Sequence, residues 1–306
     1  MENIFSSFGL TKKFKNQIAV NGVNMSINKG DIYGFVGENG SGKTTVIRLI
    51  TGLIFPTEGG FELFGERNNS KNIGKARSRI GAIVESPSIY LNMSAYDNLR
   101  SQCILLGAKE DKILDALKSV GLEELYNEKK HAGDFSLGMR QRLGIAMALL
   151  SEPELLILDE PMNGLDPAGI VEIRELIIRL NKEKGISFLI SSHILSELSL
   201  VASKYGIISK GRLIKEITAE ELHRACAKTI EISADKKDEL IDAVKTALPQ
   251  NSIEVNESGI CIFGEAELNP LLKAILEKDI KILSVNCNDT GIEEYYLSLI
   301  GGGSDA

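Results

Sequence analysis

Cysteine is scarce in this sequence, and no apolar run in it is long. The 306 residues include four cysteines, Cys103, Cys226, Cys261 and Cys287, which lie far apart and form no CxxC pair. This spacing predicts reduced packing thiols and argues against disulfides or a cysteine metal site. No apolar run approaches the roughly 20 residues that a membrane-spanning helix requires. The sequence therefore argues against a disulfide-rich secreted domain and against a transmembrane protein.

Positively charged residues are fewer than negatively charged ones. The chain has 35 lysines and arginines against 42 aspartates and glutamates, which gives a formal net charge of −7. Nucleic-acid binding requires clustered basic residues, so this balance argues against a broad nucleic-acid surface. The first residues, MENIFSSFGLTKKF, contain no hydrophobic signal core followed by a cleavage site. With 43% hydrophobic and 25% charged residues, the composition predicts a globular, soluble protein of the cytosol.

One glycine-rich stretch, GENGSGKTT at residues 37–45, has the composition of a phosphate-binding loop. It lies between an apolar run at residues 32–36 and an amphipathic run from Val46, the strand, loop and helix context that such a loop requires. Glycines let backbone N–H groups turn toward an anion, and the helix start adds the positive end of its dipole. The Lys43 ammonium can reach the outer phosphates, and the Thr44 hydroxyl can ligate Mg²⁺. The residues predicted to hold the triphosphate are Asn39, Gly40, Ser41, Gly42, Lys43, Thr44 and Thr45.

The alternative for residues 37–45 is an ordinary glycine-rich turn, which the Lys-Thr pair and the following helix disfavour.

A second group of candidate site residues follows the continuous apolar run LLIL at residues 155–158, which is typical of a strand buried on both faces of a parallel sheet. The run ends in Asp159 and Glu160, where open α/β sheets bind ligands. Asp159 can hold Mg²⁺ together with Thr44, and Glu160 is the natural general base for an attacking water. A solvated acidic turn is the alternative.

The rest of the chain alternates strands and helices. Further strands are predicted in hairpins at residues 3–27 and at residues 80–85, 186–190, 205–209 and 212–217, with helices in residues 94–125, 135–150 and 170–180. After about Ala219 the character changes to a small α+β unit of alternating short elements. The chain is therefore predicted to contain two domains, residues 1–218 and residues 219–306.

Several segments together make a family resemblance specific. FSLGMRQR at residues 135–142 resembles the signature motif of the ATP-binding cassette (ABC) ATPases, and it lies shortly before LLILDEP, as in that family. MNGLDP at residues 162–167 resembles the family's D-loop, SSH ending at His193 its switch histidine, and LTKKF its adenine-stacking segment with Phe14. The resemblance implies an α/β fold: a P-loop NTPase core with an antiparallel β subdomain and a helical subdomain at about residues 86–150. The residues themselves are equally compatible with Phe14 as a core or edge aromatic.

The signature segment offers a second group of anion-binding donors. Ser136 and Gly138 open a helix, so they present a hydroxyl and free N–H groups. The resemblance implies that they cap the γ-phosphate of ATP bound to a partner subunit, while His193 senses that phosphate. One phosphate loop and one signature segment per chain therefore imply a homodimer or a heterodimer that encloses ATP between its subunits. Leu137 and Met139 stand where the family usually carries glycine and glutamine.

Glu85 is a second departure from the family pattern. It follows the strand predicted near residue 80, where most members have a glutamine that contacts Mg²⁺ and the attacking water. A carboxylate can also ligate Mg²⁺, so Glu85 is a candidate metal ligand and catalytic residue, although it adds negative charge beside the phosphates. The alternative is a plain loop residue. An acidic residue at this position resembles the ATPases of lantibiotic-immunity and bacitracin-type exporters.

The segment after Glu85 is rich in apolar residues: Pro87, Ile89, Tyr90, Leu91 and Met93. In the family this region docks cytoplasmic helices of the membrane subunits; the alternative is the core of the helical subdomain. The part after Ala219 resembles the C-terminal regulatory extensions of some exporter ATPases.

The combined prediction is the ATPase subunit of an ABC exporter, with ATP and Mg²⁺ bound. The resemblance places it in the cytoplasm, at the inner face of the membrane through a permease, and implies a peptide antibiotic or similar amphiphile as cargo. The rival is a soluble ABC-type mechanical ATPase that acts on nucleic acid or ribosomes; the acidic balance, the single cassette and the lack of a long heptad run argue against it. A third possibility is a regulatory module that hydrolyses poorly, which Glu85 and the altered signature favour.

Overall fold

The computed structural model describes residues 2–256, 259–264, 267–288 and 291–301. The chain divides into two compact units, Met1–Ala219 and Glu220–Ala306. Each unit has its own cluster of buried apolar side chains. The division lies one residue from the predicted boundary at residues 218 and 219.

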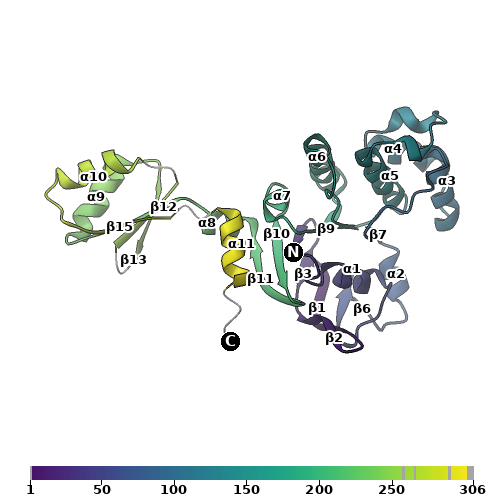
Figure 1. The fold of residues 1–306 in the computed structure, drawn as a ribbon, viewed down its shortest axis with the longest axis horizontal. Helices are drawn as coiled ribbons and strands as arrows, with labels where there is room; N and C mark the ends of the chain where they lie inside the picture. The colour runs from purple at the N-terminus through teal and green to yellow at the C-terminus, as the bar shows by residue number, and fades with distance from the viewer. Residues whose placement is uncertain (1, 257–258, 265–266, 289–290, 302–306) are drawn as a thin grey trace. The chain divides into compact units, whose positions relative to one another are not determined.

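An antiparallel sheet opens the first unit. Its strands β1 (Asn3–Phe14), β2 (Gln17–Val23), β5 (Glu58–Leu63) and β6 (Glu66–Arg67) follow the order β2-β1-β5-β6, and β3 (Ser26–Asn28) also pairs with β1. The inward residues are apolar: Phe5, Leu10, Phe61 and Leu63 are all fully buried. This sheet is the antiparallel part that the resemblance implies (Figure 1).

A six-stranded, mostly parallel sheet carries the acidic and phosphate-loop segments. Its order is β11-β10-β4-β9-β8-β7, with β7 (Ile80–Ile83), β8 (Leu155–Asp159), β9 (Ser187–Ser192), β4 (Ile32–Val36) and β10 (Lys204–Ser209) all parallel. Only the edge strand β11 (Arg212–Thr218) runs antiparallel, in a hairpin with β10. Every residue of β4, β8 and β9 is buried. Because parallel strands are covered on both faces, they carry apolar runs such as residues 155–158 of β8, which the sequence predicted to be buried, and residues 188–190 of β9.

The helix α1 (Lys43–Thr51) joins the two sheets in one core. Its residues Val46, Ile47, Leu49 and Ile50 are fully buried in a cluster with side chains of both sheets. These four positions follow the i, i+1, i+3, i+4 spacing of one apolar helix face, which is the face that packs against the sheets. This packing fixes the direction of the helix start, where Lys43 lies.

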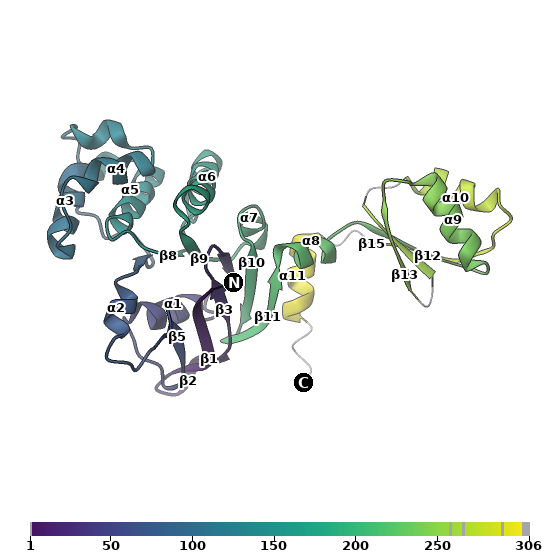
Figure 2. The ribbon, with the colours of Figure 1, turned by 180° about the vertical axis from the view of Figure 1, so that it is seen from behind.

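The helices α3 (Ala95–Leu106), α4 (Lys112–Ser119) and α5 (Leu137–Leu149) gather beyond β7 in both views (Figures 1 and 2). Ser94 caps α3 by accepting the N–H of Asp97 at 3.1 Å, and Gly107 ends it in a left-handed conformation. The long helix α6 (Pro167–Lys184) begins at Asp166, whose carboxylate accepts the Gly169 N–H at 3.0 Å. This unit also contains the short α-helices α2 (Ile73–Arg77) and α7 (Leu195–Ser199) and two 3₁₀-helices, Glu123–Tyr126 and Ala132–Asp134.

The second unit is an α+β structure in the order β12 (Thr229–Ala234), α9 (Lys237–Ala247), β13 (Ser252–Asn256), β14 (Gly259–Phe263), α10 (Leu268–Leu276), β15 (Ile282–Asn288). The strands form an antiparallel sheet in the order β13-β14-β12-β15, which is the split βαβ arrangement of ferredoxin-like folds. Ile232, Leu240, Val244, Ile262 and Ile275 form its core. Helices α8 (Ala219–Ala225) and α11 (Ile292–Gly301) flank this arrangement in sequence.

Two sequence predictions on smaller features can be compared with the structure. The four cysteines are free thiols; Cys103 is buried, and burial raises the pKa of its thiol, whereas Cys287 is exposed and is not the packing thiol that the sequence predicted. The predicted strand at residues 80–85 ends earlier, at Ile83. Glu85 has φ +64°, a left-handed conformation that a strand ladder does not accommodate. Across the described part of the chain, no helix combines the length and the apolar character needed to span a bilayer.

Candidate active site

The loop at residues 37–45 connects the end of β4 to the start of α1. Gly40 and Gly42 have φ +79° and +111°, which side-chain-bearing residues rarely adopt. A Cβ on Gly42 would also lie 2.6 Å from the Ala19 carbonyl oxygen, closer than any real contact. Glycine is therefore required at this position by both conformation and space.

The start of α1 leaves its first-turn donors without a capping side chain. Its N-cap residue is Gly42, which has no side chain, and no acidic residue lies in the first turn. Helix starts of this kind bind anions because several N–H groups and the dipole point at one place. A cavity of about 450 Å³ opens beside them, lined by Gln17, Ile18, Ala19, Asn39, Gly40, Gly42, Lys43, Thr44, Thr45, Glu160, Lys210 and Gly211. Six of the seven residues predicted to hold the triphosphate, all except Ser41, therefore meet Glu160 at one cavity.

Lys43 is nearly buried, and its ammonium is held by three oxygen atoms. The Nζ atom donates to the Gly37 carbonyl at 2.6 Å and to the Glu38 carbonyl at 3.2 Å, and it lies 3.2 Å from Oε1 of Glu160. Its exposed fraction is 5%. A buried ammonium requires such partners, since desolvating an unpaired charge is costly. The arrangement fixes one positive charge at the base of the phosphate loop.

Asp159 and Glu160 lie at the carboxyl end of β8, and Ser191 of the neighbouring β9 orients both. The Ser191 hydroxyl donates to Oδ1 of Asp159 at 2.6 Å and accepts the Glu160 N–H at 2.9 Å. Asp159 is only 2% exposed. Glu160 has φ +49°, so its backbone turns sharply out of the strand. One serine thus sets the direction of two adjacent acidic residues.

His193 completes this group from the loop after β9. Its Nδ1 lies 2.8 Å from Oε2 of Glu160, while Oε1 of the same carboxylate faces Lys43. Glu160 is therefore held from both sides, with 20% of its side chain exposed. A carboxylate fixed in this way at the edge of a cavity can orient a water and accept its proton.

Phe14, at the end of β1, is 45% exposed, so it is not part of the core. It pairs in register with Gln17, the first residue of β2, which lines the cavity. The Lys12 ammonium lies 5.1 Å from the centre of its ring. The structure thus places an exposed aromatic face next to one side of the cavity.

Ser136 and Gly138 are at the start of α5, and neither is among the described residues that line the cavity. The Ser136 hydroxyl caps the helix by accepting the Met139 N–H at 3.2 Å. Its own proton remains available to an acceptor outside the chain. Ser41, the other predicted contact absent from the cavity lining, has a buried hydroxyl oxygen without a hydrogen-bond partner.

Glu85 does not line the cavity either. Its carboxylate instead pairs with the guanidinium of Arg48 on α1, and its side chain is 61% exposed. The structure therefore brings Lys43, Glu160 and His193 together, whereas Glu85 pairs with Arg48 outside this group.

Comparison with known proteins gives a consistent result. A family model described as ABC transporter matches residues 20–163. The chain is 42% identical over 307 residues to the bacitracin transport ATP-binding protein BcrA of Bacillus licheniformis, an alignment that covers 99% of each chain. The chain belongs to the ABC transporter family. The lantibiotic transport ATP-binding protein SrtF of Streptococcus pyogenes is 45% identical over 207 residues, which cover 68% of this chain and 87% of the relative.

Solved structures agree with this assignment. CbiO1 of Clostridium perfringens, described as part of an ABC transporter complex, aligns with a TM-score of 0.67 at 28% identity over 82% of this chain and 97% of that one. The ATP-binding cassette MJ0796, solved as a dimer with ADP and Pi, aligns with a TM-score of 0.63 at 25% identity over 71% and 99%. ABC cassettes bind and hydrolyse ATP, so this ABC chain is an ATPase, and the predicted fold and enzyme class are confirmed.

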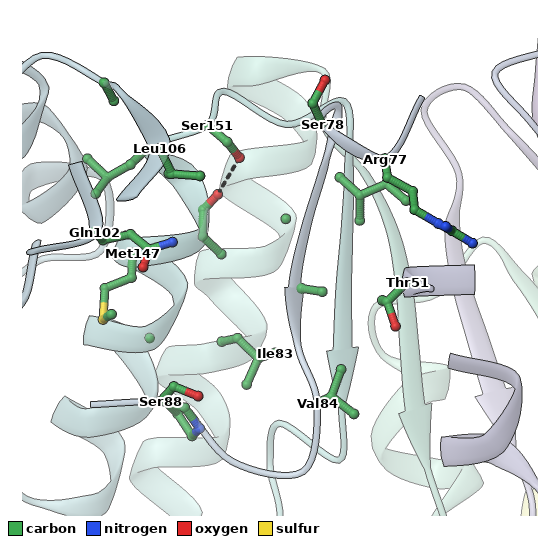
Figure 3. Close-up of a pocket in the computed structure, with 18 of the residues that line it drawn as sticks. Thr51, Arg77, Ser78, Ile83, Val84, Ser88, Gln102, Leu106, Met147 and Ser151 are labelled. Atoms are coloured by element: carbon green, nitrogen blue, oxygen red, sulfur yellow. Dashed lines mark hydrogen bonds between the residues drawn. The ribbon is translucent and has the colours of Figure 1, made fainter. Parts of the chain in front are cut away.

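This ABC ATPase has a second, larger cavity of about 820 Å³ that separates α3 and α5 from the end of α1. Figure 3 shows Gln102, Leu106 and Met147 on one side, Thr51 and Arg77 on the other, and Ile83 and Val84 of the β7 segment between them. Of the apolar segment after Glu85, Pro87 lines this groove, and Tyr90 and Leu91 are 53% and 55% exposed. The last two are therefore not core residues.

Sequence reasoning missed several residues of the ABC site. Residues 17–19 and the Lys210-Gly211 turn line the nucleotide cavity, and the Gly211 N–H donates to the Ser41 carbonyl at 2.9 Å. The sequence does mark Lys210-Gly211 as a turn, but no local pattern states which loop a turn touches. Ser191 was visible in the SSH segment, although its spacing did not indicate its bond to Asp159.

Proposed function

We propose that this chain is the ATP-hydrolysing subunit of an exporter that carries a bacitracin-like peptide antibiotic, or a similar amphiphile, through a separate membrane permease. The observation that supports this most is the 42% identity to a bacitracin transport ATP-binding protein over 99% of both chains. That alignment extends through the second unit as well as the ATPase unit, so the whole architecture is shared.

The proposed cofactor is Mg²⁺, held by Thr44 and Asp159, with Glu85 as a further candidate ligand. The fit is chemical: Thr44 lines the cavity, Asp159 is nearly buried, and hydroxyl and carboxylate oxygens are the donors that Mg²⁺ prefers. Among the described residues, no group of three or more His, Cys, Asp or Glu side chains is arranged to hold a metal, so phosphate oxygens would complete the ligand set. An ion held there by Thr44 and Asp159 would supply positive charge that offsets the negative charge of the phosphates during hydrolysis.

For the chemical step we assign Glu160 as the base that orients and deprotonates water, and His193 as the residue that contacts the γ-phosphate. Lys43 and the backbone of the loop, including Asn39, Gly40, Ser41, Gly42 and Thr45, bind the phosphates. Phe14 stacks on the adenine, which its exposed ring beside the cavity supports. The 2.8 Å contact between His193 and Glu160 supports a shared role.

Ser136 and Gly138 act across a dimer in this proposal. Their position outside the cavity of their own chain supports a role on the nucleotide of a second cassette, in a homodimer or a heterodimer. The structural relative MJ0796 was solved as a dimer.

The groove of Figure 3 is the proposed docking site for a cytoplasmic helix of the permease. It is lined by apolar side chains such as Ile83, Val84, Leu106 and Met147, together with polar groups at its rim. Docking there would place the chain in the cytoplasm, at the inner face of the membrane. We assign residues 1–218 as the nucleotide-binding domain, with residues 86–150 as its helical subdomain, and residues 219–306 as an accessory or regulatory domain.

The rival, a mechanical ATPase that acts on nucleic acid or ribosomes, is disfavoured by the transporter relatives and by the net charge of −7. An affinity-tagged chain extracted in mild detergent distinguishes the two. Recovery of a multi-spanning membrane protein supports the exporter, whereas recovery of ribosomes or DNA contradicts it. The matched control is the same extraction with a variant at an exposed lining residue of the groove, Leu106→Asp, which should lose the membrane protein but keep ATP binding.

The cargo is tested in cells that depend on this chain for resistance. Cells with the wild-type chain should tolerate a peptide antibiotic of the bacitracin class, and cells with Lys43→Ala should be sensitive. Equal sensitivity of both strains across bacitracin and lantibiotics would contradict the proposed cargo while leaving the ATPase assignment intact.

A further inference from the structure

Glu85 and Glu160 occupy equivalent places on neighbouring strands. β7 and β8 are parallel, and Ile83 pairs in register with Leu158. Each glutamate lies two residues beyond that pair, with φ +64° for Glu85 and +49° for Glu160. A left-handed conformation is strained for a glutamate, and two such residues at one edge of a sheet point to a functional constraint.

Both glutamates contact cations of the same helix. Glu160 lies 3.2 Å from the Lys43 ammonium at the first residue of α1, and Glu85 pairs with the guanidinium of Arg48 on that helix. Helix α1 thus supplies one cation to each of the two carboxylates. The Lys43 pair belongs to the nucleotide site described above; the Arg48 pair has no assigned role.

Stability does not explain the Arg48 pair. Its side chains are 40% and 61% exposed, and exposed ion pairs contribute little to folding because solvent screens them. The charge of the site does explain the Arg48 pair. Two carboxylates, those of Asp159 at the end of β8 and Glu160 just after it, already lie at the edge where a triphosphate binds. Glu85 follows the adjacent strand β7, and without a compensating cation its third carboxylate would repel the phosphates.

We propose that Arg48 is a positioning residue for Glu85. Its guanidinium holds the carboxylate at the end of β7 and compensates its charge, which allows an acidic residue to stand beside bound nucleotide. The inference rests on the proposed function only in that the cavity at residues 37–45 binds ATP. It predicts that the effect of Arg48 on nucleotide binding depends on Glu85.

The test is a double-mutant cycle with Arg48→Gln, Glu85→Gln and the double variant. Equilibrium binding of a fluorescent ATP analogue is measured without Mg²⁺, at low ionic strength, so that metal ligation and turnover do not contribute. Arg48→Gln should weaken binding about threefold to fivefold, the upper part of the range for a partly exposed charge at low ionic strength. Glu85→Gln should bind at least as tightly as wild type, and the double variant should lie within about twofold of Glu85→Gln.

The matched control is Arg100→Gln, which removes the same charge from an exposed pair on α3, where Arg100 lies 3.0 Å from Glu110. It should bind the analogue as wild type does. Unchanged binding by Arg48→Gln would overturn the proposal. So would an equal loss in Arg48→Gln and in the double variant, because Arg48 would then act on the nucleotide directly or on the fold. Failure of the proposed function gives a different result: Lys43→Ala would bind the analogue as tightly as wild type.

Discussion

At the scale of single residues, the site depends on one carboxylate that two basic side chains hold. Glu160 faces Lys43 through one oxygen and His193 through the other. A bound γ-phosphate would compete with Glu160 for the Lys43 ammonium, and this competition would release the carboxylate toward water. The residue-scale predictions therefore concern these two residues.

Replacing Lys43 with alanine should weaken ATP binding at least about tenfold, since a charge-assisted contact to phosphate contributes roughly 1.5–3 kcal/mol. Hydrolysis should be lost as well. Isothermal titration with ATP measures the affinity, and Lys75→Ala, which removes an exposed lysine of α2, is the control. Wild-type affinity in Lys43→Ala would contradict the phosphate-loop assignment.

Replacing Glu160 with glutamine should leave ATP binding intact and slow hydrolysis at least about a hundredfold, because general-base catalysis contributes that much or more. With hydrolysis blocked, ATP should hold two chains together, and size-exclusion chromatography with Mg²⁺ and ATP should show a dimer. Glu183→Gln, an exposed change on α6, serves as the control. A monomer at saturating ATP would count against a nucleotide shared between subunits.

At the scale of elements, β7 and β8 are followed by the glutamates Glu85 and Glu160 and are preceded by an ion pair between Arg79 and Glu154. The Glu154 N–H donates to the Arg79 carbonyl at 2.9 Å, just before the two strands pair. The Arg79 guanidinium also donates to both oxygens of Glu154, at 2.6 and 2.8 Å. These hydrogen bonds hold the pKa of Glu154 below its ordinary value of 4.5 and outweigh the opposing effect of burial. The pair lies just before the parallel register of β7 and β8 that brings Glu85 and Glu160 level.

A depressed carboxyl pKa stabilises the folded state above the unfolded pKa, and this contribution disappears as the pH falls below about 4.5. Glu154→Gln should therefore lower the free energy of unfolding by up to about 1 kcal/mol at pH 7, because the pair is partly exposed. The difference from wild type should shrink as the pH falls from 7 to 3, because the contribution is lost as the folded-state carboxylate is protonated. Urea unfolding at both pH values measures it; a difference that is as large at pH 3 as at pH 7 would assign the effect to packing instead.

At the scale of the whole molecule, the chain is two folding units with separate cores. The first contains the loop at residues 37–45 and both sheets; the second is the ferredoxin-like unit from Glu220. No described residue of the second unit lines the nucleotide cavity. Nucleotide should therefore stabilise one unit and not the other.

Differential scanning calorimetry of the full chain should show two transitions. ATP at about 100 times its Kd should stabilise the unit that binds it by roughly 2.7 kcal/mol and shift only that transition. A fragment of residues 1–218 should retain the shifted transition and ATP binding. If both transitions move together with nucleotide, the units are coupled and the second belongs to the ATP-binding structure.

The sequence alone determined the parts of this protein that depend on neighbours along the chain. Apolar runs at residues 32–36 and 155–158 predicted buried strands, and the loop residues around Lys43 and the Asp159-Glu160 pair predicted the site. These signals are local because hydrophobic periodicity and turn chemistry act over a few residues. They also sufficed to recognise the family.

Only the tertiary structure decided which distant groups meet. Arg48 and Glu85 are 37 residues apart, and Ser191 and Asp159 are 32 apart, so no local pattern links them. The Lys210-Gly211 turn reaches the phosphate loop only because β10 lies beside β4. Such contacts depend on how the sheets and α1 pack as a whole.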